Sequence, residues 1–435
     1  MRLYFAMFGR AGYSSDDKAR RVFFMSGLNE TPSGSRVHIG IFGRRNAGKS
    51  SIINAITGQD VAIVSDVKGT TTDPVAKAME LLPLGPVKIF DTPGLDDEGE
   101  LGHERMKRSL QVLNKSDIAL LIVDGTEGLG DLELELIERF KEKKTPYLVV
   151  YNKIDLMDAQ TLAEVKAKPK VPTDIYVSAV TGEQIYELKE MIARIAPTDE
   201  SKFQLVADLL SPSDLVVLVI PIDKAAPKGR LILPQQQTIR DILEADAMAI
   251  MTKEHELRET LESLNRKPKL VITDSQVFAK VSADTPRDVM LTSFSILFAR
   301  HKGDLEVLVR GVKAMENLKD GDRVLISEGC THHRQCDDIG TVKIPRWVRQ
   351  NTGKQLEFDF TSGGTFPDDL EKYSLIVHCG GCTLNEKEMK YRIRVAERQN
   401  IPITNYGVLM AYMQGILKRS LEPFPAIAMC LEDDE

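Results

Sequence analysis

An apolar stretch that runs into a glycine-bounded loop constrains the fold of this 435-residue chain more than any other feature. The stretch is Val37–Ser51, VHIGIFGRRNAGKSS, and it contains the pattern G-x-x-x-x-G-K-S, which begins at Gly43. Small residues let successive backbone N–H groups surround a phosphate, and a following helix over Ser51–Gly58 points its positive end at the same anion. The pattern predicts a nucleotide-binding P-loop, with Lys49 on the outer phosphates and the Ser50 hydroxyl on magnesium.

Strands and helices alternate over residues 35–198, which predicts a doubly wound, mostly parallel sheet with helices on both faces. Ligands of such sheets bind at the carboxyl ends of the strands. The expected strands are Val37–Phe42, Val87–Phe90, Ile118–Val123, Tyr147–Tyr151 and Ile175–Val177. Four further motifs follow the P-loop and are expected at this edge of the sheet.

Two of these motifs have the chemistry of a nucleotide switch. The run Lys68–Asp73, KGTTTD, precedes the second strand, and a threonine there can offer its hydroxyl to magnesium when a third phosphate is present. By itself, such a run also fits an ordinary loop. Asp91 and Gly94, in DTPG, follow the strand VKIF. We expect the Asp91 carboxylate to meet magnesium through water and the Gly94 N–H to sense the terminal phosphate.

The other two motifs predict recognition of guanine. Asn152-Lys153-Ile154-Asp155 follows the strand YLVVY, and the Asp155 carboxylate can accept hydrogen bonds from guanine N1–H and the exocyclic amine. Adenine presents no such donor pair, so this motif favours GTP over ATP. Ser178 and Ala179 end the last strand, where a backbone N–H is expected to reach the guanine oxygen.

These five motifs, in this order, resemble those of the translation-factor-like small GTPases, and two details resemble the cation-activated TrmE-like subgroup. Leu95 stands where Ras-type GTPases carry a catalytic glutamine, so the attacking water must be positioned in another way. Asn46 lies in the pattern G-R-x-N-A-G-K-S. The resemblance implies that Asn46 helps to bind potassium, that Thr71 is a magnesium ligand, and that GTPase domains pair across their switch loops. Asn46 also fits a plain turn residue.

On this basis the expected nucleotide-binding residues are Gly43, Asn46, Ala47, Gly48, Lys49, Ser50, Ser51, Asp91, Gly94, Asn152, Lys153, Asp155, Ser178 and Ala179. The expected magnesium ligands are Ser50, Thr71 and Asp91, and the switch or catalytic residues are Lys49, Thr71, Asp73 and Gly94.

Four of the five cysteines fall between Cys330 and Cys382, which favours a reducing compartment and a metal site over disulfide bonds. Cys330 and His332 follow the strand RVLIS, whereas Cys379 and Cys382, in HCGGC, follow the strand SLIVH. The C-x-x-C spacing lets two thiolates reach one metal, although alone it also fits a redox pair. Three cysteines with optional histidines fit either zinc or an iron–sulfur cluster. His378 and His332 are both candidates for a fourth ligand.

The remaining segments carry weaker signals. Residues 199–290 predict a second, smaller α/β unit whose exposed sheet edge makes it a candidate for self-association, with a structural spacer as the alternative. Residues 291–435 predict a third α/β unit, with helical periodicity over Tyr391–Leu417 around a turn at Ile401–Ile403. Residues 1–34 are expected to be a poorly ordered extension, with Met25 as an alternative start.

The composition, 42% hydrophobic and 28% charged, is typical of a soluble globular protein. A formal net charge of -7 argues against a protein that coats nucleic acid, because phosphate contacts need a basic face. No apolar run approaches the roughly 18 residues of a membrane span. Neither nucleic acid nor membrane is therefore an expected partner, and the expected location is cytoplasmic.

The whole layout resembles the HydF family of FeFe-hydrogenase maturation GTPases. The likeness is carried by the P-loop stretch and by LTSFSILFARHKGDL, EGCTHHRQCDDIGTVKIPRW and VHCGGC. It implies a homodimer formed through the middle unit and a 4Fe-4S cluster held by Cys330, Cys379 and Cys382. It also implies a GTP-hydrolysing scaffold that receives a di-iron subcluster precursor from two radical-SAM maturases and transfers it to apo FeFe-hydrogenase. The alternative is a regulatory TrmE-like GTPase of RNA modification or ribosome assembly with a structural zinc.

Overall fold

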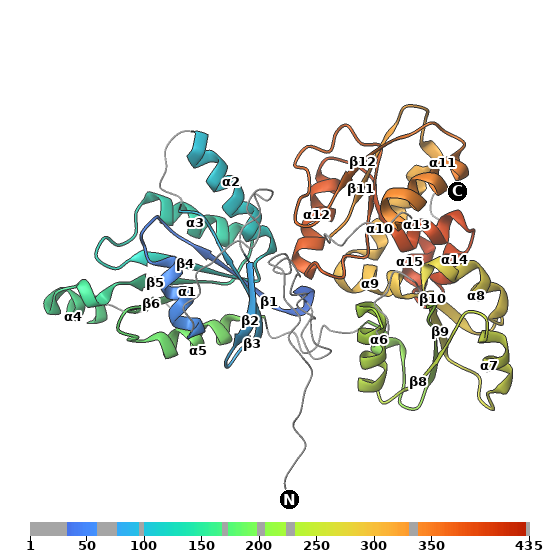
Figure 1. Ribbon diagram of the computed structural model, residues 1–435, viewed down its shortest axis with the longest axis horizontal. Helices are drawn as coiled ribbons and strands as arrows, with labels where there is room; N and C mark the ends of the chain where they lie inside the picture. Colours follow the sequence, from blue (N-terminus) through green and yellow to red (C-terminus); the bar gives the residue numbers. More distant parts are fainter. Residues whose placement is uncertain are drawn as a thin grey trace, which may run out of the picture. The chain divides into compact units, whose positions relative to one another are not determined.

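The computed structural model describes residues 33–58, 76–94, 100–167, 173–197, 205–222, 231–329 and 338–431. Within these ranges three sheets follow one another along the chain, which confirms the expected α/β class and its three units (Figure 1). Several residues singled out above lie outside the described ranges, and these are Met25, Thr71, Asp73, Leu95, Cys330 and His332.

The first sheet has the order β2-β3-β1-β4-β5-β6, and only the β2–β3 pair is antiparallel. Its strands are β1 (Val37–Phe42), β2 (Ala76–Leu81), β3 (Gly85–Asp91), β4 (Ile118–Asp124), β5 (Tyr147–Asn152) and β6 (Asp174–Tyr176). Strand β2 was not expected from the sequence. As an edge strand it buries little apolar surface, so its sequence AKAMEL lacks the apolar run that marks the inner strands.

Helices cover both faces of this sheet. They are α1 (Lys49–Thr57), α2 (Glu100–Lys115), α3 (Asp131–Glu142), α4 (Ala159–Ala167) and α5 (Ile185–Ile195). Apolar residues of α1 and α5, such as Ile53 and Leu188, fill one core, whereas α2 and α3 bury Val112 and Phe140 in the core on the opposite face. This double layer brings the loops after β1, β3, β5 and β6 to the carboxyl edge of the sheet.

The second and third sheets are entirely parallel, with the orders β10-β9-β7-β8 and β12-β11-β13-β14. Their strands are β7 (Leu215–Val219), β8 (Met248–Thr252), β9 (Leu270–Thr273), β10 (Met290–Ser293), β11 (Arg323–Ser327), β12 (Glu357–Thr361), β13 (Leu375–His378) and β14 (Ile403–Asn405). The second sheet continues past the boundary expected at residue 290, because β10 straddles it. The turn expected at Ile401–Ile403 leads into an edge strand, β14.

One hydrophobic core serves both of these sheets and runs from Val206 to Phe424. The helices around it are α6 (Leu233–Glu244), α7 (Leu257–Ser263), α8 (Phe278–Asp284), α9 (Phe294–Lys302), α10 (Leu305–Val312), α11 (Ile344–Thr352), α12 (Glu386–Arg398), α13 (Tyr406–Met413), α14 (Leu417–Ser420) and α15 (Pro425–Met429). Helix α9 packs against α6, α12 and α13, so it joins the two sheets. Burial of a side chain such as Leu297 contributes roughly 1.5–3 kcal/mol.

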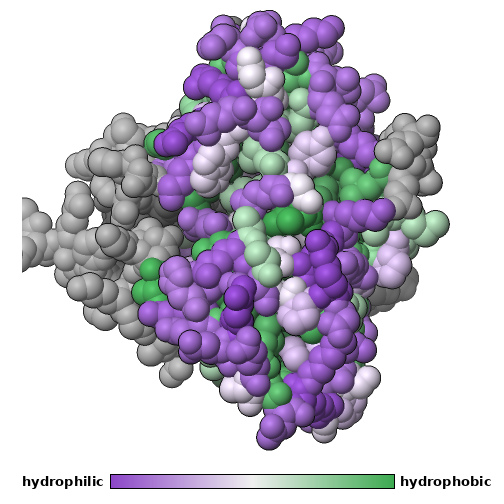
Figure 2. Space-filling view, turned by 90° about the vertical axis from the view of Figure 1, so that its right-hand side faces the viewer, coloured by the Kyte–Doolittle hydropathy of each residue, from purple (hydrophilic) through white to green (hydrophobic). Residues whose placement is uncertain are grey.

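The outer surface of these two sheets is mixed. Hydrophilic residues cover most of the face seen in Figure 2, and hydrophobic residues occur there in small patches. In the part of the chain that the structure describes, no helix combines the length and apolarity needed to cross a membrane.

Candidate functional site

The P-loop joins the end of β1 to the start of α1. Gly48 has a φ of 92°, and a Cβ placed there would lie 2.2 Å from Asn152 Nδ2, so the position excludes a side chain. No side chain caps the amino end of α1, which leaves its first N–H groups for an anion. Lys49 Nζ donates to the carbonyl oxygens of Gly43 (3.0 Å) and Arg44 (2.6 Å), which holds the ammonium against the loop.

A cavity of about 680 Å³ opens beside this loop and brings the expected motifs together. Its expected lining residues are Asn46, Gly48, Lys49, Ser50, Ser51, Asp91, Gly94, Asn152, Lys153, Asp155 and Ala179. Arg45, Thr92, Leu156 and Val180 also line the cavity and were missed by sequence reasoning. Leu156 and Val180 are largely exposed apolar side chains beside the guanine motifs, and a single apolar residue in a loop gives no sequence signal.

Asn152 ties the base-binding motif to the P-loop. Its Nδ2 donates to Ala47 O (3.1 Å), and its Oδ1 accepts from the backbone N–H of Ala179 (3.0 Å). Asp155 Oδ1 accepts from Ser178 Oγ (2.6 Å), so the carboxylate expected to bind guanine is oriented by the second guanine motif. Asn152, Lys153, Asp155 and Ala179 line the cavity, whereas Ser178 does not line it and contacts Asp155 instead.

Asp91 has the environment of a magnesium-site carboxylate. Its Oδ1 is inaccessible and has no hydrogen-bond partner among the described residues. Burial raises the pKa of Asp91, and the nearby Lys49 ammonium opposes that rise. A buried carboxylate oxygen without a partner is costly, and a hydrated divalent cation would satisfy it. The residues present therefore fit Mg²⁺, with Asp91 and Ser50 at the same cavity.

Asn46 lines the cavity in a left-handed conformation with a φ of 62°. This backbone conformation suits a turn residue, and asparagine tolerates it better than most residues do. Asn46 also lines the cavity, and its expected role as a potassium ligand stays a prediction.

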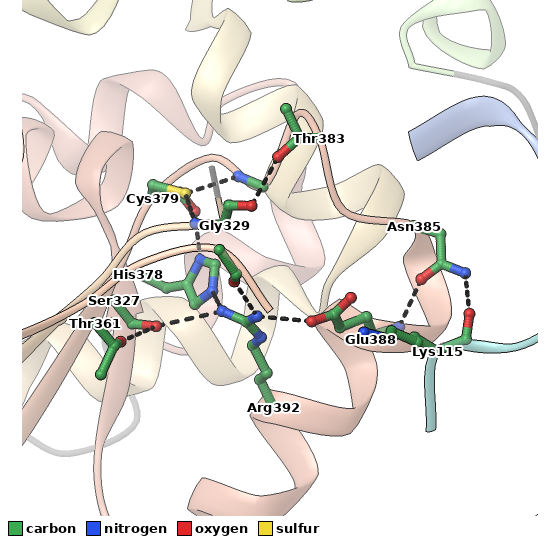
Figure 3. A network of polar contacts seen from close by, with 12 residues as sticks. Lys115, Ser327, Gly329, Thr361, His378, Cys379, Thr383, Asn385, Glu388 and Arg392 are labelled. Carbon is green, nitrogen blue, oxygen red and sulfur yellow. Dashed lines mark hydrogen bonds and ion pairs between the residues drawn. The ribbon is translucent and has the colours of Figure 1, made fainter. Parts of the chain in front are cut away.

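The loops after β11 and β13 meet at the carboxyl edge of the third sheet (Figure 3). The backbone N–H of Gly329 donates to Cys379 Sγ (3.1 Å), and Gly381 N–H donates to the same sulfur (3.4 Å). Thr383 Oγ1 donates to Gly329 O (2.9 Å), which closes the contact between the two loops. Gly329 immediately precedes Cys330, the first cysteine outside the described residues.

The surroundings of Cys379 fit a metal or cluster ligand. Burial raises the pKa of the Cys379 thiol to about 11, so a positive centre is needed to ionise it at neutral pH. The two N–H donors supply the hydrogen bonds that cluster sulfurs accept. Gly381 has a φ of 62°, and a Cβ there would lie 2.7 Å from Met389 Sδ, so the C-x-x-C loop needs glycine. Within the described ranges, no three His, Cys, Asp or Glu side chains gather around a metal position.

His378 does not have the arrangement expected of a fourth ligand. The side chain is fully buried, with Nε2 3.0 Å from Arg392 Nη1 and Nδ1 2.7 Å from Cys379 O. A guanidinium only donates, so Nε2 accepts and the proton lies on Nδ1. Burial, together with the Arg392 charge, lowers the pKa of His378 to about 3. Both ring nitrogens are therefore engaged within the protein, so His378 would have to give up one of these contacts to bind a metal, and its candidacy as a fourth ligand stays a prediction. His332, the other candidate, lies outside the described ranges.

Two buried cations near this loop were missed from the sequence. Lys302 Nζ donates to Cys382 O (3.2 Å) and Leu384 O (2.9 Å), and burial lowers the pKa of Lys302 to about 8. Arg392 is completely buried. The sequence held one sign that Arg392 is buried, a single cation within the apolar stripe of a helix. Arg392 shares the buried face of α12 with Met389 and Ile393.

Comparison with known proteins divides the chain in the same way as the sheets. A family model of the 50S ribosome-binding GTPase matches residues 38–153. GTPase Era of Carboxydothermus hydrogenoformans is 35% identical over 164 residues, which are 37% of this chain and 55% of that protein. The tRNA modification GTPase MnmE of Legionella pneumophila is 38% identical over 174 residues, which are 38% of this chain and 36% of that protein. The chain thus covers between 36% and 55% of the length of these relatives.

Among solved structures, Era of Aquifex aeolicus aligns with a TM-score of 0.32 at 21% identity, covering 52% of this chain and 98% of that one. Two further family models match later parts of the chain. They are a hydrogen maturase F dimerization domain over residues 205–303 and a hydrogen maturase F tetramerization domain over residues 306–423. The chain belongs to the hydrogen maturase F family. In this member of the hydrogen maturase F family, Cys379 and Cys382 lie in the stretch matched by the second of these models.

Proposed function

We propose that this chain is a GTP-hydrolysing scaffold for the maturation of FeFe-hydrogenase, which binds a 4Fe-4S cluster and transfers a di-iron precursor to apo-hydrogenase. The observation that carries the proposal is the bond from Gly329 N–H to Cys379 Sγ, since it joins the two loops that bear the cysteines. The hydrogen maturase F domain models support the same assignment.

GTP is the proposed substrate of the first unit. Asp155, oriented by Ser178, accepts hydrogen bonds from guanine, and the P-loop with Lys49 binds the phosphates. Ser50 and Asp91 would hold Mg²⁺, with Thr71 as the proposed third ligand and Asp73 beside it in the same switch run. Asn46 is the proposed ligand of K⁺, which would supply positive charge beside the phosphates.

Cys330, Cys379 and Cys382 are the proposed cluster ligands. When bound, such a cluster supplies an iron with an exchangeable fourth position. The chain's own contribution is to hold Cys379 by two N–H groups and the C-x-x-C loop by Lys302. The di-iron precursor is the cargo, with two radical-SAM maturases as the proposed donors and apo FeFe-hydrogenase as the acceptor.

Self-association through the second sheet is part of the proposal. Strand β8 lies at one edge of that sheet and exposes 42% of Met248 and 55% of Met251. An exposed apolar edge strand is a natural pairing surface for a second copy. The dimerization and tetramerization domain models support oligomers built from residues 205–423.

The test is metal analysis of the full chain after anaerobic reconstitution with iron and sulfide. We expect iron and sulfide to bind with a broad visible absorbance, and Cys379→Ser to lose both. Cys430→Ser is the matched control, because Cys430 is buried beside Arg310, outside the proposed site. One tightly bound zinc per chain, with no retained iron, would instead support the regulatory GTPase that the MnmE likeness suggests.

A further inference from the structure

The carboxyl ends of β11 and β13 are joined by one buried guanidinium. We propose that Arg392 is a positioning residue that fixes His378 as its Nδ1–H tautomer and thereby sets the spacing of the two strand ends that precede Cys330 and Cys379. This inference rests on the proposed cluster site, but the contacts that carry it are contacts of the chain itself.

Arg392 reaches both strand ends from helix α12. Nη1 donates to Ser327 Oγ (3.4 Å) on β11 and to His378 Nε2 (3.0 Å) on β13 (Figure 3). Ser327 is the last residue of β11 and precedes Cys330 by three residues, and His378 is the last residue of β13 and directly precedes Cys379. A single rigid group therefore contacts the chain next to each cysteine-bearing loop.

The guanidinium itself is held in place on the other side. Nη2 donates to Gly363 O (2.8 Å) and forms an ion pair with Glu388 Oε1 (2.7 Å), one turn earlier on α12. The Arg392 side chain is 1% exposed, and its guanidinium carbon lies 5.3 Å from the centre of the Phe366 ring. A planar fork with donors in fixed directions can satisfy these partners together, whereas a lysine ammonium cannot.

Through its contact with His378, Arg392 also restrains the start of the C-x-x-C loop. Because Arg392 can only donate, it selects the His378 tautomer whose Nε2 carries a lone pair. The proton on Nδ1 is then donated to Cys379 O at 2.7 Å. In metal sites, residues that orient ligands without touching the metal typically change affinity or activity 10–100-fold when removed. Arg392 and His378 occupy such positions here.

The first test is independent of iron. The ¹⁵N chemical shifts of histidine distinguish the Nδ1–H tautomer from the Nε2–H tautomer, and the chain has seven histidines. His378→Asn assigns the signal in the metal-free full chain. We expect wild type to show the Nδ1–H form at neutral pH and Arg392→Met to lose that preference. An Nε2–H tautomer in wild type, or an unchanged signal in Arg392→Met, would overturn the proposal.

The second test measures release of iron from the reconstituted full chain in the presence of a chelator. We expect Arg392→Met and His378→Asn each to release iron roughly 10–100-fold faster than wild type. The double variant should be no faster than either single variant, because both changes break one pathway. Arg394→Met is the matched control on the same helix, since Arg394 is exposed and its Nε donates to Lys390 O (3.1 Å) within α12.

Two outcomes separate this inference from the proposed function. If wild type binds no iron, the cluster proposal fails while the tautomer test still decides the role of Arg392. If pulsed electron paramagnetic resonance shows a histidine nitrogen on the cluster that disappears only in His378→Asn, His378 is a ligand and the inference is overturned. Should Arg392→Met fail to fold, Arg392→Lys carries both tests, because it keeps the charge and loses the fork.

Discussion

At the scale of the residue, the two proposed sites use polar side chains in different ways. In the first unit the site residues face a cavity, and their bonds to one another, such as Asp155 to Ser178, orient groups that a ligand would meet. In the third unit, two buried cations contact the C-x-x-C loop or the residue before it. Lys302 donates to Cys382 O, and Arg392 donates to His378 Nε2. The first pattern suits a ligand that enters and leaves, and the second suits a group that stays.

Lys49→Ala should reduce GTP hydrolysis by at least about 100-fold, because the ammonium that now binds two P-loop carbonyls is the group placed to stabilise developing phosphate charge. Iron content after reconstitution should not change. Phosphate release and iron assays on the same preparation measure both quantities. Lys141→Ala, at an exposed position on α3, is the control. Loss of iron in Lys49→Ala would show that the sites depend on each other.

Asp155→Asn should shift nucleotide preference from guanine toward xanthine. The amide offers a donor where the carboxylate accepts, which matches the carbonyl of xanthine and opposes the exocyclic amine of guanine. Titration with GTP and with xanthosine triphosphate gives the ratio of affinities, and we expect GTP binding to weaken by at least about tenfold, or about 1.4 kcal/mol. Asp131→Asn, exposed on α3, should leave the ratio as in wild type. Equal GTP affinity in Asp155→Asn would remove the base-recognition assignment.

At the scale of the element, the central feature is helix α9. It follows β10 of the second sheet and packs against α12 and α13 of the third. Its sequence, FSILFARHK, buries residues around most of its circumference, which is typical of a helix inside a core rather than on its surface. A domain boundary placed near residue 290 therefore divides a strand and separates α9 from part of its own packing.

Leu297→Ala should lower the free energy of unfolding of the second and third units by about 2–5 kcal/mol, because Leu297 is completely buried in their shared core. Trp347 is the chain's single tryptophan and lies on α11 of the third unit, so its fluorescence during denaturation reports that unit. Leu243→Ala, at a position 57% exposed on α6, should change the midpoint little. A Trp347 transition unaffected by Leu297→Ala would contradict the shared core.

The sequence predicted elements wherever their signal was local. The P-loop, DTPG and the guanine motif specify their own turns, and buried strands such as Ile118–Asp124 carry an apolar run. Strand β2 pairs with its neighbour β3, and it was not predictable because its sequence lacks an apolar run. The fusion of two units into one core was not predictable because it depends on contacts between distant segments. Likewise, the role of Arg392 needed the positions of Ser327 and His378, which lie 65 and 14 residues away. The cysteines themselves were predicted from the C-x-x-C spacing, from their position after two strands and from the family resemblance.

At the scale of the whole molecule, the proposed assembly depends on the edge of the second sheet. Parallel sheets are usually covered on both faces, so a free edge rather than a face is where a second copy can add. The edge strand β8 has the burial pattern of a partly exposed element, in contrast to the completely buried β7 beside it.

Met251→Lys should weaken self-association by at least about tenfold, because a charge on an edge strand disfavours pairing with another strand. Sedimentation equilibrium over a range of concentrations measures the dissociation constant. Met429→Lys is the matched control, since Met429 is 61% exposed on α15 and far from β8 in sequence. An unchanged dissociation constant in Met251→Lys would move the interface away from this edge.

The core that runs from Val206 to Phe424 also limits where the chain can be divided into two separately folding pieces. A chain cut between α9 and α10 would leave each half with an exposed apolar surface that the other half covers in the intact chain. Such exposed apolar surfaces cause aggregation. Neither half should then be soluble when it is expressed alone. The two halves should associate and stay soluble when they are expressed together. A conformational change in this part of the chain should therefore take place in the loops around the core and not by separation of the two sheets.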